Sequence, residues 1–186
     1  MANEHQLKQT RGKLEQSKKY ELLTNDTIEL GGGVTLFRIK ALISFGNVEK
    51  GELGGYVEKE DNLCHSGNAW VTGNARVYSN ARVFGDAWVT GDAWVTGNAK
   101  VYGNARVYSN ADVSGDAKVY DNAKVTDNAL VYGNAKVYGD AWVTDNAWVT
   151  GNAKVTGNAE VTSIAWVTGN AKVTGNAKVS GGELLN

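Results

Sequence analysis

A six-residue repeat constrains this chain more than any other feature. Residues 67–180 divide into nineteen consecutive hexapeptides, each reading Gly, Ser or Asp, then Asn or Asp, then Ala-x-Val, then Thr, Tyr, Ser or Phe. Only Ile164 breaks the pattern. Ala and Val lie two positions apart, so on an extended strand they point the same way, while the residues after each point the opposite way. The repeat therefore predicts short strands that bury Ala and Val.

The residues between these strands predict corners. Gly tolerates positive φ without a Cβ penalty, and Asn or Asp adopts it at low cost. Three strands and three corners make a coil of 18 residues, so nineteen units form a little over six coils. The string "GDAWVTGDAWVTGNAK" at residue 85 returns almost unchanged at residue 139, which is three whole coils later.

This motif resembles the hexapeptide-repeat proteins that form left-handed parallel β-helices. The resemblance covers about three fifths of the chain. It implies an all-β fold, a left-handed parallel β-helix of about six triangular coils with a small N-terminal β cap. The left-handed sense comes from the resemblance alone.

The rest of the chain predicts smaller parts around this helix. Residues 1–19 are expected to be a helical or disordered arm, 20–66 a small β cap, 67–180 the β-helix and 181–186 a C-terminal lid that folds Leu184 and Leu185 over the last coil. Within the cap, "VTLFRIKALISF" reads as one or two strands. The glycines at 31–33 and at 54–55 read as turns.

Composition excludes several classes of protein. The formal charge is −1, with 19 basic and 20 acidic side chains, so no global field favours nucleic acid or membrane. The chain has a single cysteine and no run of about 18 apolar residues. We expect a cytoplasmic protein with no membrane partner.

One predicted face is basic. Every third hexapeptide falls on the same face, and one face has only basic residues at its central outward position: Arg82, Lys100, Lys118, Lys136, Lys154 and Lys172. Beside them, after each valine, stand Phe84, Tyr102, Tyr120 and Tyr138. Together they predict a strip that binds phosphate or carboxylate groups and stacks on bases. The alternative is structural, because lysine rows keep a flat sheet soluble and tyrosine rows stabilise it by cross-strand stacking.

The tryptophans occupy the central outward position of the other two faces. Trp70, Trp88 and Trp142 share one face, and Trp94, Trp148 and Trp166 share the next, where Leu130 adds an apolar group. Aligned exposed tryptophans are typical of interfaces. The predicted interface comprises Trp88, Trp94, Leu130, Trp142, Trp148 and Trp166. It would mediate self-association or bind a protein partner. The alternative is that "AWVT" was duplicated with the repeat and was not selected for binding. The resemblance implies a homotrimer first and a dimer second.

The resemblance also raises an enzyme hypothesis, since many left-handed β-helix proteins are acyltransferases that use acetyl- or acyl-CoA. Those enzymes place a catalytic histidine near the junction of neighbouring prisms, often with a loop extruded from the coils. This chain has only His5 and His65, and no loop interrupts its repeats. We therefore predict no catalytic residue and no cofactor.

Metal binding and nucleophilic chemistry find little support in the sequence. Cys64 and His65 are adjacent, so on a strand they point to opposite faces, which favours structural roles. One cysteine and two separated histidines supply no recognisable metal-ligand set. Asp86, Asp121 and Asp140 recur at one corner, where an ordinary turn role is expected. No metal site is predicted.

The pattern of residues 19–63, followed by the coils, resembles a group of bacterial and phage or prophage hexapeptide-repeat proteins, many described only as transferases or polymer-forming proteins. We expect a non-enzymatic binding protein, an inhibitor of a host defence system. It would bind a host protein or an anionic, nucleotide-like ligand through the basic face and the tryptophans. The alternatives are a CoA-dependent acyltransferase and a structural or polymer-forming protein.

Overall fold

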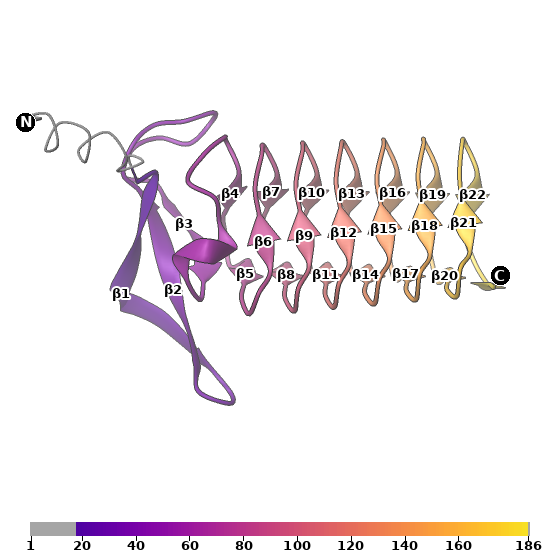
Figure 1. Cartoon of the computed structure of the whole chain (residues 1–186), viewed down its shortest axis with the longest axis horizontal. Helices are drawn as coiled ribbons and strands as arrows, with labels where there is room; N and C mark the ends of the chain where they lie inside the picture. Colours follow the sequence, from indigo (N-terminus) through magenta and orange to yellow (C-terminus); the bar gives the residue numbers. More distant parts are fainter. Residues whose placement is uncertain (1–17, 186) are drawn as a thin grey trace, which may run out of the picture.

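The fold is an all-β parallel solenoid of about seven triangular turns with an antiparallel hairpin at its N-terminal end. The computed structural model describes residues 18–185. In Figure 1 the hairpin lies at the indigo end, and the coils stack along the long axis to the yellow C-terminal end. The fold class predicted from the repeat is confirmed. The predicted arm lies outside the described residues, except for Lys18 and Lys19.

The cap consists of a hairpin that leads into the first coil. Strands β1 (Tyr20–Leu30) and β2 (Val34–Ala41) are antiparallel, and the glycine turn between them confirms the prediction for residues 31–33. Strand β3 (Leu53–Val57) pairs antiparallel with β2 on one side and parallel with β5 (Arg76–Val77), the second repeat strand, on the other. A short 3₁₀ helix, η1 (Glu60–Asn62), follows. The first turn thus begins inside the predicted cap, which explains the additional turn.

The coils contribute two-residue strands to three sheets. The six-stranded sheet contains β6 (Arg82–Val83), β9 (Lys100–Val101), β12 (Lys118–Val119), β15 (Lys136–Val137), β18 (Lys154–Val155) and β21 (Lys172–Val173). The seven-stranded sheet contains β4 (Trp70–Val71), β7 (Trp88–Val89), β10 (Arg106–Val107), β13 (Lys124–Val125), β16 (Trp142–Val143), β19 (Glu160–Val161) and β22 (Lys178–Val179). The ten-stranded sheet joins β1, β2 and β3 to β5 (Arg76–Val77), β8 (Trp94–Val95), β11 (Asp112–Val113), β14 (Leu130–Val131), β17 (Trp148–Val149), β20 (Trp166–Val167) and β23 (Glu183–Leu184).

Strands β4 to β19 each pair in parallel with the strand 18 residues later, as Lys118 does with Lys136. The repeat alanines and valines are fully or almost fully buried up to Val173. The corner residues ahead of the alanines form a further ladder, in which Asn122 donates to Asp140 at 3.0 Å, for example. Stacked rungs of similar geometry therefore fix the position of each outward-facing residue along the solenoid axis.

Two predictions about glycines and the C-terminus need correction. Gly54 and Gly55 are not turns but buried residues of β3, packed so closely that a Cβ on Gly55 would lie 2.6 Å from the carbonyl oxygen of Ala75. The predicted lid is instead a strand, since Glu183–Leu184 extends the ten-stranded sheet beside β20. Leu185 is 64% exposed and does not cover the last coil. Within residues 18–185 no helix is long and apolar enough to cross a membrane.

Candidate functional site

The basic face exists as the repeat predicted. Arg82, Lys100, Lys118, Lys136, Lys154 and Lys172 stand on successive strands of the six-stranded sheet, each paired in register with the next. Within the described part of the chain, none of them lies within 4.0 Å of a carboxylate. Six cations spaced by about one rung, 4.8 Å, therefore share one flat face without neutralisation by ion pairs.

The aromatic row beside these cations is a continuous stack. Phe84, Tyr102, Tyr120 and Tyr138 follow one another with ring centroids 4.8 to 4.9 Å apart and planes within 3° of parallel. Burial, with the nearby Asp121 carboxylate, raises the pKa of Tyr102 above its ordinary value. Because each inner ring face already contacts a neighbouring ring, the row stabilises the sheet. It offers no inner ring faces to bases, so the base-stacking role loses its physical support.

A shallow cavity of about 410 Å³ lies over the basic face. Its lining alternates lysines with corner residues: Asn98, Lys100, Asp116, Lys118, Asn134 and Lys136. Asn98 donates to Asp116 at 2.9 Å, which holds the one acidic member in the corner ladder. The surface is polar and open, and it suits a flat acidic partner better than an enclosed small molecule.

Five of the six tryptophans reach the surface. Trp94, Trp142, Trp148 and Trp166 are about two fifths exposed, and Trp88 is half-buried against the core. Trp148 and Trp166 pack edge to face at 5.6 Å beside Ile164, which is 74% exposed. Leu130 lies between Asp112 and Trp148 on the ten-stranded sheet. Self-association through this patch stays a prediction.

Trp70 is the exception among the tryptophans. It is fully buried, because the loop between β2 and β3 covers its position on the seven-stranded sheet. Phe45 of that loop packs edge to face on its ring at 5.3 Å, and Tyr20 does so at 6.2 Å. The predicted outward tryptophan is therefore the centre of the contact between cap and solenoid.

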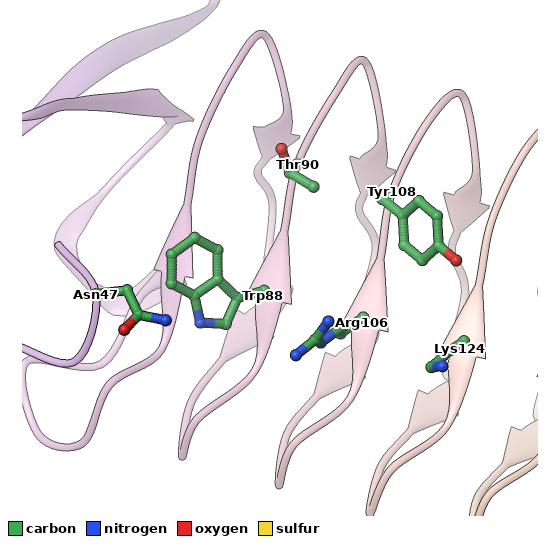
Figure 2. Close-up of a pocket in the computed structure, with 6 residues that line it drawn as sticks. All are labelled: Asn47, Trp88, Thr90, Arg106, Tyr108 and Lys124. Atoms are coloured by element: carbon green, nitrogen blue, oxygen red, sulfur yellow. The ribbon is translucent and has the colours of Figure 1, made fainter.

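The structure also shows a groove that was not among the predicted sites. It has a volume of about 440 Å³ and lies on the seven-stranded sheet beside the β2–β3 loop (Figure 2). Its lining is Asn47, Trp88, Thr90, Arg106, Tyr108 and Lys124. The 18-residue map of faces already places Trp88, Arg106 and Lys124 on consecutive rungs. Asn47 had no such signal, because a loop conformation outside the repeat brings it there.

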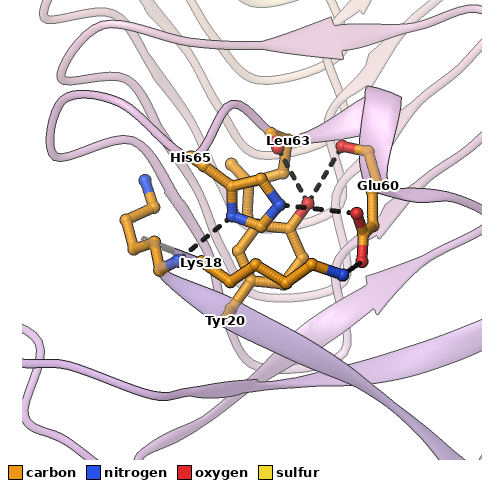
Figure 3. A network of polar contacts seen from close by, with 6 residues as sticks. Lys18, Tyr20, Glu60, Leu63 and His65 are labelled. Carbon is orange, nitrogen blue, oxygen red and sulfur yellow. Dashed lines mark hydrogen bonds and ion pairs between the residues drawn. The ribbon is translucent and has the colours of Figure 1, made fainter. Parts of the chain in front are cut away.

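The side chains of Cys64 and His65 have separate partners among the described residues. The ring of His65 stacks on Tyr20 at 4.4 Å, its Nδ1 accepts from the backbone N–H of Lys19 at 3.2 Å, and its Nε2 lies 3.7 Å from Glu60 (Figure 3). The Cys64 sulfur instead lies 3.1 Å from the Ser66 hydroxyl. His65 thus fastens the first cap strand to the η1 segment, in agreement with a structural role.

This contact predicts a pH dependence. Burial lowers the pKa of His65, because removal from water disfavours the charged ring. The hydrogen bond that Nδ1 accepts from the backbone N–H of Lys19 is also compatible only with a ring that is unprotonated at Nδ1. The unfolded chain binds the proton more readily, so the stability that His65 contributes is complete above about pH 6.5 and is lost as the pH falls below that value. The Lys18 ammonium lowers the pKa of Glu60, whose loss of stability begins only below about pH 4.5.

In urea titrations we expect the free energy of unfolding to fall as the pH drops below about 6.5. This slope should flatten in a His65→Gln variant, which keeps an acceptor for Lys19. A His5→Gln variant, which changes the only other histidine, serves as control and should keep the slope. An unchanged slope in His65→Gln would show that the contact does not set the pH dependence.

The corner aspartates accept hydrogen bonds from corner residues of neighbouring coils. Asp86 accepts from the side chain of Asn68 at 2.8 Å, and Asp121 accepts from the backbone N–H of Gly139 at 3.2 Å. Among the described residues, no group of three His, Cys, Asp or Glu side chains is placed to hold a metal ion. These contacts agree with the ordinary turn role predicted for them.

Comparison with known proteins adds one finding on the fold. A family model described as the YdcK beta solenoid repeat matches residues 75–91. The match spans about one coil and part of the groove-lining sheet, and it describes a repeat rather than an activity. A search of curated proteins finds no match to the chain. The chain therefore carries a β-solenoid repeat similar to that of the YdcK family.

Proposed function

We propose that the chain is a non-enzymatic binding protein whose basic face recognises an acidic surface on a protein partner. The observation that carries this proposal is the row from Arg82 to Lys172, six cations that have no carboxylate partner among residues 18–185. The solenoid fixes their backbone positions, so little ordering is needed on binding. A rigid, complementary charge pattern favours fast and selective association.

A protein partner suits this face better than a nucleic acid. The stacked rings from Phe84 to Tyr138 leave no inner faces for bases. Rungs about 4.8 Å apart are also closer together than the phosphates of an extended single strand. Carboxylates on a protein surface have no imposed period, so a partner can match the row. The resemblance of the N-terminal segment to phage and prophage proteins supports a partner in a bacterial host, such as a component of its defence, and hence a cytoplasmic location.

The test compares two polyanions with two charge-reversal variants. We expect polyglutamate to bind the wild-type chain more tightly than an oligothymidylate of equal charge, with affinity falling as salt rises. Lys100→Glu/Lys118→Glu/Lys136→Glu should weaken polyglutamate binding by at least about tenfold, measured by fluorescence anisotropy. The matched control is Lys40→Glu/Lys50→Glu/Lys178→Glu, which makes the same change in charge outside the basic face.

The control should lose much less affinity than the basic-face variant. Equal losses in both variants would mean that net charge alone governs binding, and the proposal would fail. Tighter binding of the oligonucleotide would instead assign the face to nucleic acid. Circular dichroism on each variant checks that the solenoid is intact.

A further inference from the structure

The groove on the seven-stranded sheet is separate from the basic face and does not depend on the proposed function. Its floor is formed by consecutive rungs, where Trp88 pairs in register with Arg106 and Arg106 with Lys124. Thr90 and Tyr108 stand at the next outward position of the first two rungs, and Asn47 closes the N-terminal end (Figure 2). In Figure 2 the Asn47 amide, the indole nitrogen and the guanidinium lie along one side, with Tyr108 and Thr90 along the other. The groove therefore has a polar side and a side lined by Tyr108 and Thr90.

The wall that Asn47 provides is held in place. Phe45 and Val48 exchange backbone hydrogen bonds of 3.0 and 2.8 Å, which close a tight turn around Gly46 and Asn47. Val48 is buried, and Phe45 packs on Trp70. Because both flanking residues are anchored in the core, the loop forms the groove before any ligand arrives. Binding therefore costs little conformational entropy for ordering this loop.

The side chains that line the groove have polar groups and ring faces without partners among the described residues. In the part of the chain that the structure describes, none of the six lining side chains takes part in a hydrogen bond between side chains or in an ion pair. Among the rings of residues 18–185, Trp88 and Tyr108 stack on no other, in contrast to the tyrosines of the basic face. The Lys124 ammonium lies 5.6 Å from the centre of the Trp142 ring, a contact that leaves its hydrogen-bond donors free. Two cations and two ring faces thus remain available together.

The order of these groups along the axis defines a ligand class. An indole and a side-chain amide lie at one end, and two cations lie one and two rungs further on. The midpoint between the cations is about 7 Å from Trp88 along the axis, since each rung adds about 4.8 Å. We infer that the groove binds a nucleotide-like anion, with its flat heteroaromatic ring against Trp88 and within reach of Asn47, and its phosphate between Arg106 and Lys124. A volume of about 440 Å³ suits a ligand of that size.

The experiment uses AMP, adenosine and inorganic phosphate as separate probes in isothermal titration calorimetry with the full chain. AMP is expected to bind at least about tenfold more tightly than either fragment, because only AMP engages both ends of the groove. Arg106→Gln and Lys124→Gln should each weaken AMP by about tenfold and leave adenosine unchanged. Trp88→Leu should weaken both AMP and adenosine, and leave phosphate unchanged.

The matched control is Lys118→Gln/Lys136→Gln, which removes two adjacent cations from the six-stranded sheet and should leave AMP binding as in the wild type. AMP that binds no more tightly than inorganic phosphate would overturn the inference and reduce the groove to an anion-binding patch. AMP binding that survives both groove substitutions, or falls equally in the control, would overturn it as well. None of these outcomes bears on polyglutamate binding by the basic face, so the two proposals fail independently.

Discussion

Trp70→Ala is expected to lower the free energy of unfolding by about 3–5 kcal/mol, the range for removing a large buried aromatic side chain. Trp70 is fully buried, and it contacts both Phe45 of the loop and Tyr20 of the first cap strand. Its removal leaves a cavity between the loop, the first cap strand and the first coil. Urea unfolding followed by far-UV circular dichroism gives the change in free energy.

Two variants make the result specific. Trp142→Ala removes the same residue from the same sheet and the same strand position, but the Trp142 side chain is 40% exposed, so it should cost less than half as much. Trp70→Phe should also cost much less than alanine, since the indole Nε1 has no hydrogen-bond partner in the structure and its loss leaves no polar group unpaired. Equal costs for Trp70→Ala and Trp142→Ala would contradict the central role of Trp70.

The second large effect is expected at the glycine pair of β3. A Cβ on Gly54 would lie 2.6 Å from the carbonyl oxygen of Val71 and would also strike Ile39. A Cβ on Gly55 would lie 2.9 Å from a methyl carbon of Val71. The Val71 carbonyl oxygen on one side and the fully buried Ile39 side chain on the other leave little room for relaxation. Gly54→Ala should therefore destabilise the chain by about 3 kcal/mol, at the upper end of the range for overpacking.

Hydrogen exchange would show which strands Gly54→Ala destabilises. Faster exchange is expected in β1, β2 and β3, while the central coils keep their protection. Gly31→Ala is the matched control, because a Cβ at Gly31 would meet no atom within 4 Å beyond its chain neighbours, and the φ of Gly31 is not in the left-handed region. That change should stay within about 0.5 kcal/mol of the wild type. A small effect of Gly54→Ala would mean that the cap can move away from the first coil at little cost.

The solenoid could be predicted in detail because one local rule is repeated. The alternation of Ala117 and Val119 with outward Lys118 fixes which side chains enter the core, and the 18-residue step places Lys118 beside Lys136 without any tertiary information. The basic face and its aromatic row followed from the same arithmetic. The contacts within the row did not, since stacking depends on the rotamers that the tyrosines adopt.

The cap and the groove were harder to predict because they rest on contacts outside the repeat. Trp70 occupies a position that is outward in every other coil, and only the path of the β2–β3 loop buries it. The same loop supplies Asn47 to the groove. Gly54 and Gly55 resemble a turn in sequence, but they allow β3 to approach Ile39 and Val71 closely. In each case a long-range contact overrides the local signal.

The register of the sheets has a consequence for how such a gene can change in length. Strands β4 to β19 each pair with the strand 18 residues later. Removing or duplicating a stretch of that size, such as residues 121–138, therefore preserves all three faces beyond it. Removing a single hexapeptide would instead rotate every later coil by one face and bring lysines into line with tryptophans. Near-identical repeats are prone to unequal recombination, and only whole-coil products would keep the surface pattern. Selection on these surfaces would therefore appear as solenoids that differ in length by full turns.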